Sequence, residues 1–173
     1  MNDRIVLVDA DPRRPAMFDE EAARIRGAAG ASLVALEHVG STAVPGLVAK
    51  PVIDMLGGVR TLEDADALVP RVVALGYEYV TKYEDELPRR RYFVRWAEGV
   101  RTHHFHVVEV GSWFWTQQLA FRDHLRQDPD ASARYGALKR ELASRFPDDR
   151  EAYTAAKSDF IAACLPGARV QGR

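Results

Sequence analysis

Two neighbouring stretches carry the residue types that bind phosphate and metal ions. Gly40, Ser41 and Thr42 follow an apolar run and form a small, hydroxyl-rich turn. Glycine lets the backbone approach a ligand closely, and the hydroxyl and nearby N–H groups can donate hydrogen bonds to an anion. Asp54 lies inside the next apolar run, where a carboxylate is costly to bury unless a cation pairs with it. We therefore expect phosphate at the turn and a divalent metal ion at Asp54.

A second group of candidate residues lies in the histidine string that starts at His103. On a strand, alternation places His104 and His106 on one face, about 7 Å apart at a rise of ~3.3 Å per residue. Two imidazoles at this spacing can bind one ligand or one metal ion, and His38, at the end of the first apolar run, could converge on them. The alternative is a pair of histidines hydrogen-bonded within a half-buried sheet.

Basic residues that could bind phosphate oxygens occur at two places. Lys50 precedes Pro51 at the start of the apolar run around Asp54, a good position for meeting a β- or γ-phosphate. Arg89 and Arg91 open a later run, and alternation would turn both in the same direction. A guanidinium group suits forked contacts with phosphate. The alternative interpretation is a solvated charge run at the start of a strand.

The turn and the acid together resemble a known signature. A Gly-Ser turn followed by a strand carboxylate thirteen residues after the serine, as from Ser41 to Asp54, is similar to the nucleotidyltransferase superfamily. The longer string that starts at His38 resembles the GrpB family more narrowly: His-Val-Gly-Ser-Thr-Ala-Val-Pro-Gly-Leu-Val-Ala-Lys-Pro-Val-Ile-Asp. Three later strings also resemble that family, at 101–106, 138–143 and 148–160. The resemblance covers nearly the whole chain.

The resemblance implies a protein that binds a nucleoside triphosphate with a divalent metal ion and transfers a nucleoside monophosphate to an acceptor. In the superfamily the Gly-Ser turn holds the triphosphate and strand carboxylates hold Mg²⁺. Carried over to this chain, Asp54 would bind the metal, and Gly40, Ser41 and Lys50 would bind the phosphates. Catalysis would consist mostly of positioning and charge neutralisation.

This sequence departs from the superfamily pattern at one point. The pattern has a second carboxylate two positions from the first, whereas Val52 and Leu56 stand at those positions here. Two-metal transfer needs both the attacking and the leaving oxygen clamped, which one carboxylate does poorly. His104 or His106 would then act as the general base or as a replacement metal ligand.

Two alternative functions follow from the same residues. One is a metal-dependent hydrolase in which His38, Asp54, His104 and His106 hold a single ion, for which imidazole favours Zn²⁺ or Mn²⁺ over Mg²⁺. The other is a nucleotide- or phosphometabolite-binding module that has lost turnover, which the missing second acid favours.

Composition limits the class of protein. A chain of 173 residues suits one ordinary domain, and we assign residues 1–165 to it and 166–173 to a C-terminal tail. The 24 basic and 25 acidic residues give a net charge of −1, which argues against nucleic acid or an anionic membrane as a partner. The single cysteine, Cys164, fits a reducing compartment. Without a signal-peptide pattern or a run near the ~18 apolar residues of a membrane span, we expect a cytoplasmic protein.

Apolar periodicity indicates an α+β fold, with a mixed β-sheet flanked by helices and a helical C-terminal third. The resemblance implies that this fold is nucleotidyltransferase-like. Strands are predicted over 5–8, 33–38, 52–56, 77–80 and the two arms of a hairpin, 90–96 and 100–110. The third of these is expected to end at Gly57-Gly58. Helices are predicted over 15–29 and after caps at Thr61, Ser112, Asp130 and Asp148.

Overall fold

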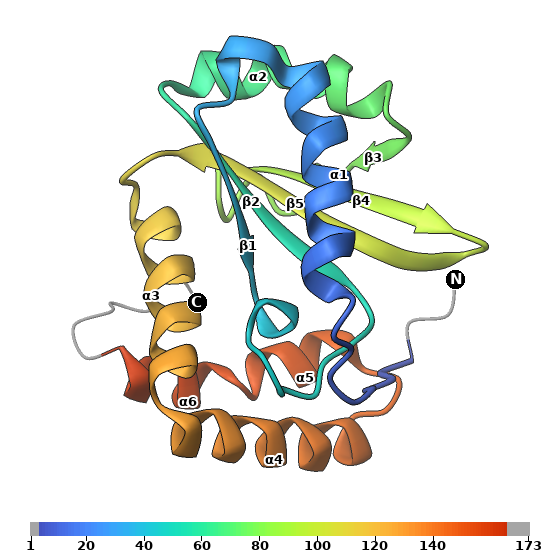
Figure 1. Ribbon diagram of the computed structural model, residues 1–173, viewed down its shortest axis with the longest axis vertical. Coiled ribbons are helices and arrows are strands. Elements are labelled where there is room, and N and C mark those ends of the chain that lie inside the picture. The colour runs from blue at the N-terminus through green and yellow to red at the C-terminus, as the bar shows by residue number, and fades with distance from the viewer. Residues whose placement is uncertain (1–3, 166–173) are drawn as a thin grey trace.

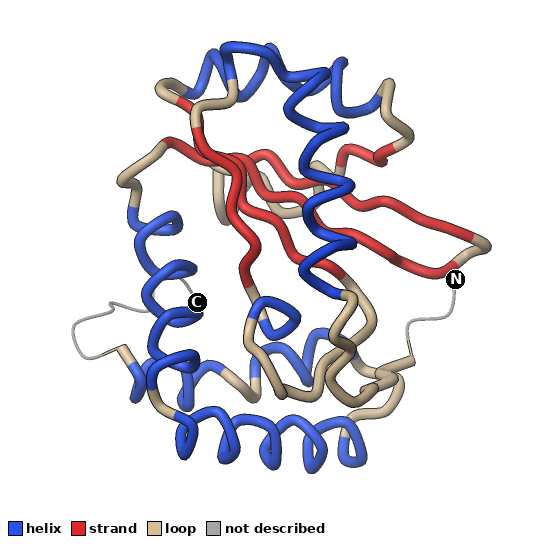
Figure 2. Tube along the Cα trace, viewed as in Figure 1, coloured by secondary structure: helices blue, strands red, loops and turns tan. Residues whose placement is uncertain are grey.

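A computed structural model of the protein describes residues 4–165. Its strands are β1 (Ala35–Val39), β2 (Ile53–Val59), β3 (Tyr77–Tyr79), β4 (Arg91–Ala97) and β5 (Val100–Glu109). Its helices are α1 (Arg14–Ala29), α2 (Leu62–Val73), α3 (Trp113–Gln127), α4 (Pro129–Arg145), α5 (Arg150–Ala155) and α6 (Ser158–Cys164). This is the predicted α+β class, with one mixed sheet and a helical C-terminal third (Figure 1 and Figure 2). The predicted tail, 166–173, lies outside the described residues.

The strands form one sheet in the order β1-β2-β5-β4-β3. β2 and β5 run parallel, and the other neighbouring strands run antiparallel. The register sets Asp54 opposite Val39 on β1 and opposite His104 on β5. Side chains at paired positions share a face of the sheet, so the acid and the histidine point to the same side.

The two faces of the sheet are covered by different helices. α1 and α2 pack on one face, where Met55 and Phe105 belong to the largest buried cluster. On the other face, Leu56 and Val108 pack against Phe114 and other apolar residues of α3. The remaining helices of the C-terminal third, α4 to α6, lie near the end of β1, and α4 contacts the loop that follows the strand. The face of Asp54 is therefore the face turned toward the C-terminal helices.

The prediction that the second central strand ends at Gly57-Gly58 is wrong, because β2 continues to Val59. A Cβ on Gly57 would lie 2.8 Å from the ring of Phe105. A Cβ on Gly58 would lie 2.8 Å from the ring of Trp115. These glycines make room for aromatic rings on the two faces of the sheet and do not form a turn.

Gly57→Ala is therefore expected to lower the free energy of unfolding by roughly 1–3 kcal/mol, since overpacking moves buried side chains away from their rotamers. In a Phe105→Leu background the same change should cost less, because the clashing ring is gone. Urea unfolding of the single and double variants measures this coupling. Gly27→Ala, where no atom lies within 4 Å of the added Cβ, serves as the control. Equal losses for Gly57→Ala in both backgrounds would contradict this account.

The predicted strand over 5–8 is also wrong. The segment makes a single bridge between Val8 and Ala49. Ile5 is instead buried against Leu142 and Tyr153, and its N–H donates to the carbonyl of Pro147. Ile5 thus packs on the C-terminal helices, whereas Val6 and Val8 are exposed.

Helix caps were predicted with mixed success. Thr61 and Ser112 accept hydrogen bonds from the third residue after them, as predicted for caps. The caps predicted at Asp130 and Asp148 are wrong: α4 is capped by Asp128 and α5 by Asp149. Asp128 takes this role because Pro129 suits the first position of a helix. Within residues 4–165, no helix combines the length and the apolar character needed to cross a membrane.

Candidate functional site

The turn and the acid that were predicted to act together lie against each other. Gly40 has φ +68° and ψ −169°, a conformation nearly restricted to glycine, and Ser41–Ala43 then form a short 3₁₀ turn. A Cβ on Gly40 would lie 2.5 Å from Oδ2 of Asp54. The side chain of Asp54 is 31% exposed even though the strand is internal to the sheet. The carboxylate and the turn therefore form one accessible site at the ends of β1 and β2.

His104 holds the carboxylate of Asp54 from the neighbouring strand, with 2.8 Å between Nδ1 and Oδ1. Burial lowers the pKa of His104, so the neutral ring donates its Nδ1–H to the acid. Nε2 is then left with a lone pair, and it is buried without a hydrogen-bond partner among the described residues. Burial alone would raise the pKa of Asp54, but the hydrogen bond and nearby positive charge, including Lys50, lower it overall. The pair is an anion beside a neutral base.

His106 shares the face of His104 but has different surroundings. Its ring stacks on Tyr92 with the centroids 4.6 Å apart, and the centroid of Phe114 lies 5.5 Å away. Burial lowers the pKa of His106 to about 3, so the ring is neutral. Its Nδ1 is buried and lacks a hydrogen-bond partner within residues 4–165. His106 borders the site as part of an aromatic stack.

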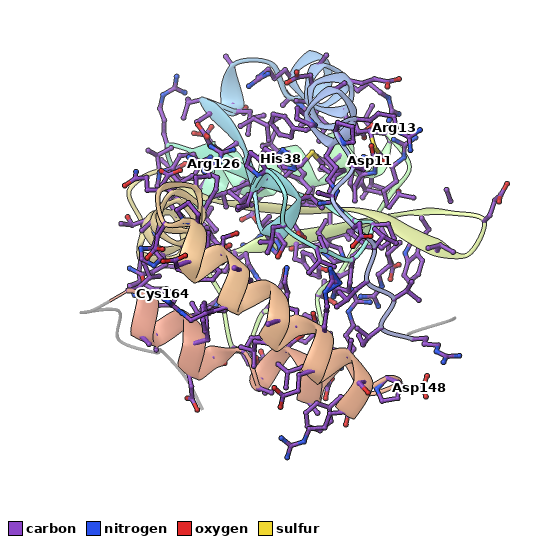
Figure 3. All side chains as sticks on the ribbon, turned by 60° about the horizontal axis from the view of Figure 1, so that its bottom comes forward. Asp11, Arg13, His38, Arg126, Asp148 and Cys164 are labelled. Atoms are coloured by element: carbon purple, nitrogen blue, oxygen red, sulfur yellow. The ribbon has the colours of Figure 1, made fainter. Side chains whose placement is uncertain are left out.

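His38 does not join this group. It lies opposite Met55, on the face that α1 covers, and its ring stacks on Phe18 of α1 with 4.8 Å between centroids. Its Nε2 is 2.9 Å from the hydroxyl of Thr42, which also turns that residue away from Asp54. Figure 3 shows His38 on the same side of the sheet as Asp11, with Asp148 and Cys164 on the other side. Across the described chain, no group of three or more His, Cys, Asp or Glu side chains is placed to hold a metal ion.

Lys139 joins α4 to the turn. Its ammonium group donates hydrogen bonds to the hydroxyl of Ser41, at 2.9 Å, and to the carbonyl oxygen of Val48. The residue is only 2% exposed. An ammonium group carries three donors, so one N–H of Lys139 remains for a ligand.

Two more lysines share one aromatic ring. Lys50 lies in the loop before β2 and Lys157 is the last residue before α6. Their Nζ atoms are 5.6 and 4.4 Å from the ring centroid of Tyr153. The negative charge of Asp54 favours the charged form of both lysines and of Lys139, and so acts to raise their pKa values. The site therefore sets three ammonium groups against one carboxylate.

Burial and mutual repulsion weaken the charged form of these lysines. Burial and the positive charge of Arg150 and Lys157 lower the pKa of Lys50 to about 7. Burial and the charge of Lys157 do the same for Lys139, also to about 7. Burial lowers the pKa of Lys157 to about 8, against a favourable effect of Asp54. A multiply charged anion placed here would reverse all three shifts.

The two arginines predicted to bind phosphate are not brought to the turn. Arg89 pairs with Glu109 at the far end of β5. Arg91 pairs with Asp66 of α2, at 2.5 Å, on the opposite side of the sheet. Arg90 instead lies over the rings of Tyr92 and Phe114, next to His106.

Lys139 and Lys157 were missed as candidates on the sequence. Both lie in segments that were predicted to be helical, where a single lysine gives no local signal of function. The signal that could have found them is the resemblance of the strings at 138–143 and 148–160 to the GrpB family, since each string contains one of them.

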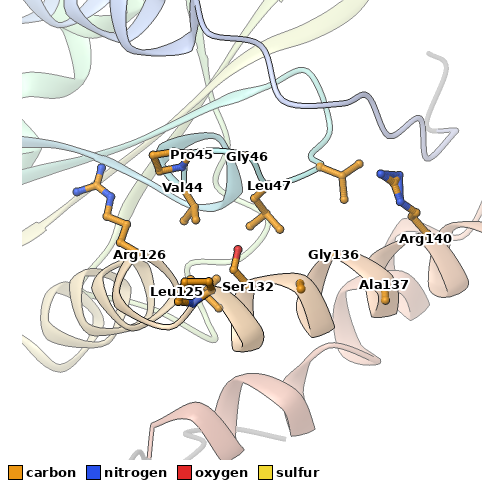
Figure 4. Close-up of a pocket in the computed structure, with 13 residues that line it drawn as sticks. Val44, Pro45, Gly46, Leu47, Leu125, Arg126, Ser132, Gly136, Ala137 and Arg140 are labelled. Atoms are coloured by element: carbon orange, nitrogen blue, oxygen red, sulfur yellow. The ribbon is translucent and has the colours of Figure 1, made fainter.

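Two open pockets lie beside the turn, and neither is lined by Asp54. One, of about 710 Å³, lies between residues 44–48 and α4 (Figure 4). The other, of about 720 Å³, includes His38, Arg122 and Arg126. Both guanidinium groups in that pocket already bind acceptors of the protein itself. We therefore assign the candidate site to the group around Asp54.

Comparison with known proteins identifies the relatives of this chain. A family model described as GrpB protein matches residues 4–166. The chain belongs to the GrpB family. A crystal structure of the conserved protein GrpB from Enterococcus faecalis is 35% identical and superposes with a TM-score of 0.82, over 92% of this chain and 94% of that one. The resemblance to the GrpB family is thereby confirmed, and the α+β fold with it.

Two bacterial relatives extend the comparison within the GrpB family. A UPF0157 protein of Pseudomonas aeruginosa is 42% identical over 95% of this chain and 67% of its own length. The UPF0157 protein YqkA of Bacillus subtilis is 38% identical over 83% of this chain and 41% of its own length. This chain thus spans about two thirds of the first relative and less than half of the second.

Proposed function

We propose that this GrpB-family protein binds a nucleoside triphosphate together with a divalent metal ion at Asp54, and transfers the nucleoside monophosphate to an acceptor. The observation that carries the proposal is the close approach of the turn to Asp54, since a Cβ on Gly40 would lie 2.5 Å from Oδ2 of that residue. This closeness supports the proposal, because a turn with hydrogen-bond donors beside a carboxylate is the arrangement that a metal-bound triphosphate needs. Ser41 and the lysines around it supply donors for the phosphates.

The donor set suits one Mg²⁺ or Mn²⁺. Mg²⁺ is commonly held by one or two carboxylates, with waters and substrate phosphates completing the shell. Asp54 supplies one carboxylate, while Val52 and Leu56, at the positions of a second, are buried apolar residues. When bound, the ion supplies neutralisation of phosphate charge. His104 fixes the orientation of Asp54. Its Nε2 is buried, so this atom would have to be uncovered before it could accept a proton from the attacking group.

A second candidate function is a phosphometabolite-binding module without turnover. The excess of three lysines over one carboxylate favours it, because the cations alone can bind an anion. The hydrolase with one transition metal has less support, since His38 lies on the other face of the sheet from Asp54.

Asp54→Asn is expected to weaken binding of a nucleoside triphosphate in the presence of Mg²⁺ by tenfold or more, because the amide keeps the shape of the side chain but loses its charge. Isothermal titration of a nucleotide panel with Mg²⁺ and with Mn²⁺ measures this. Asp66→Asn removes an acid on the opposite side of the sheet and should bind like the wild type. Failure of every nucleotide to bind the wild type would refute the proposal, and binding without pyrophosphate release would favour the module.

A further inference from the structure

Three of the four lysines of the chain belong to the candidate site. Lys139 binds Ser41 in the turn, Lys50 and Lys157 lie over the ring of Tyr153, and the charge of Asp54 acts on all three. The lysines are Lys50, Lys82, Lys139 and Lys157, and the other twenty of the 24 basic residues are arginines. The three at the site come from the loop before β2, from α4 and from the N-cap of α6. A chain that uses arginine almost everywhere else has placed lysine here from three separate segments. A compact ammonium charge is what these positions share.

Placing these three lysines close together is energetically unfavourable in the ligand-free protein. Lys139 is buried and the other two lysines are half-buried. Within residues 4–165 none of the three forms an ion pair with a carboxylate, whereas Lys82 is 65% exposed and pairs with Glu151. Buried cations are costly unless an anion pairs with them. The arrangement therefore lacks negative charge that a ligand can supply.

The number of carboxylates around β2 limits how many metal ions the site can hold. Where two carboxylates lie on a strand, they can hold two metal ions that neutralise a phosphate chain. The positions two residues from Asp54 are Val52, just before β2, and Leu56, within it, so one acid remains. The positive charge available at this site comes from the three lysines.

Resting on the proposed function, we propose that Lys50, Lys139 and Lys157 bind the terminal phosphates of the triphosphate and replace a second metal ion. The nucleotide then binds with one divalent ion, which lies at Asp54. The lysines contact the phosphate chain and make no contact with the nucleoside. Tyr153 holds the two half-buried lysines in place through its ring.

Inorganic tripolyphosphate is the probe that tests this recognition. In titration with Mg²⁺ it should bind and displace the nucleoside triphosphate, and affinity should fall on the order of tenfold or more from tri- to diphosphate and again to monophosphate. Lys50→Met and Lys157→Met should each weaken binding of both ligands by on the order of tenfold. Lys82→Met, at the fourth lysine, should change nothing. Metal titration should give one Mg²⁺ for each bound triphosphate.

A melting measurement separates this role from a structural one. Lys157→Met should raise the melting temperature of the ligand-free protein, since a poorly compensated charge is removed, and should shrink the increase that tripolyphosphate causes. A structural lysine would lower the melting temperature when replaced. The same measurement shows that each variant is folded.

The outcomes distinguish the two proposals. Nucleotide binding that ignores both lysine replacements, that is equally tight for mono- and triphosphate, or that takes up two metal ions would overturn the role of the lysines and leave the proposed function standing. Lysine-dependent binding of tripolyphosphate without binding of any nucleotide would overturn the proposed function and leave the binding of phosphate by the lysines standing. Failure of tripolyphosphate to bind would overturn the lysine proposal.

Discussion

Gly40→Ala is expected to abolish nucleotide binding, although it adds one methyl group. The residue has φ +68° and ψ −169°, where an L-residue is strained by roughly 1–3 kcal/mol. The new Cβ would also lie 2.5 Å from Oδ2 and 3.0 Å from Cβ of Asp54. The acid must turn away to relieve this contact, which breaks its hydrogen bond to His104 and moves the carboxylate that would bind the metal. Titration with a nucleoside triphosphate and Mg²⁺ measures the loss.

Gly46→Ala is the matched control for this experiment. Gly46 lies in the same loop and also has a positive φ, of 76°, but no atom lies within 4 Å of an added Cβ. The control should therefore show the strain alone, as a loss of about 1–2 kcal/mol in urea unfolding, with little change in affinity. Equal affinities for the two variants would show that the contact between Gly40 and Asp54 has no part in binding.

Stability of the ligand-free protein is expected to rise with pH from about 7 to about 10. The folded pKa values of Lys50 and Lys139 are about 7 and that of Lys157 is about 8, against an ordinary value of 10.5. Between those limits the unfolded chain binds more protons than the folded one, so the free energy of unfolding increases as pH rises. Below about pH 7 all three are charged in both states and the full cost of burying the charges remains. Urea unfolding at a series of pH values measures this slope.

Neighbouring groups set the limits of that pH window. Burial lowers the pKa values of His104 and His106, so these rings resist protonation and continue the upward slope on the acid side. Burial raises the pKa values of Tyr92 and Tyr153 to about 12, which reverses the slope above about pH 10, where unfolded tyrosine ionises first. The charged neighbours of the lysines are Arg14, Arg101, Arg150 and Asp54, and the hydrogen bond from His104 and nearby positive charge keep Asp54 ionised.

Affinity for an anion should have the opposite dependence on pH. Binding restores the charged lysines, so it takes up protons, and it should weaken on the order of a hundredfold between pH 7 and 9 for each lysine whose pKa is near 7. Titration in buffers of different ionisation enthalpy counts the protons directly. In Lys157→Met fewer protons should be taken up, whereas in Lys82→Met the number should stay the same. Binding that takes up no protons at any pH would show that the lysines do not meet the ligand.

The part of the fold that was predictable from sequence is the part that local rules determine. The caps at Thr61 and Ser112 and the two-residue turn at Glu98-Gly99, with φ values of 50° and 76°, follow from neighbouring residues alone. The strand end predicted at Gly57 was wrong. Local rules treat a glycine as a strand end, whereas here the ring of Phe105 on the neighbouring strand leaves no space for a side chain.

In the candidate site, too, the residues predicted from sequence are those that a short local pattern identifies. Asp54 and Gly40 were found because the spacing between them is short and carries a resemblance. His38 was placed wrongly because a one-residue difference in strand register reverses the face: it lies opposite Met55, and its neighbour Val39 lies opposite Asp54. Lys157 reaches the site only through the packing of the C-terminal helices, which no local period encodes.

The hydrogen bond between Asp54 and His104 joins two parallel strands across 50 residues of sequence. Parallel strands cannot be linked by a tight turn, and closing a long loop costs chain entropy before any contact forms. The β4–β5 hairpin has no such barrier, because only Glu98 and Gly99 separate its paired ends. We therefore expect the hairpin to form early in folding and the two halves of the site to meet late. A partly folded chain would then be unable to bind its ligand.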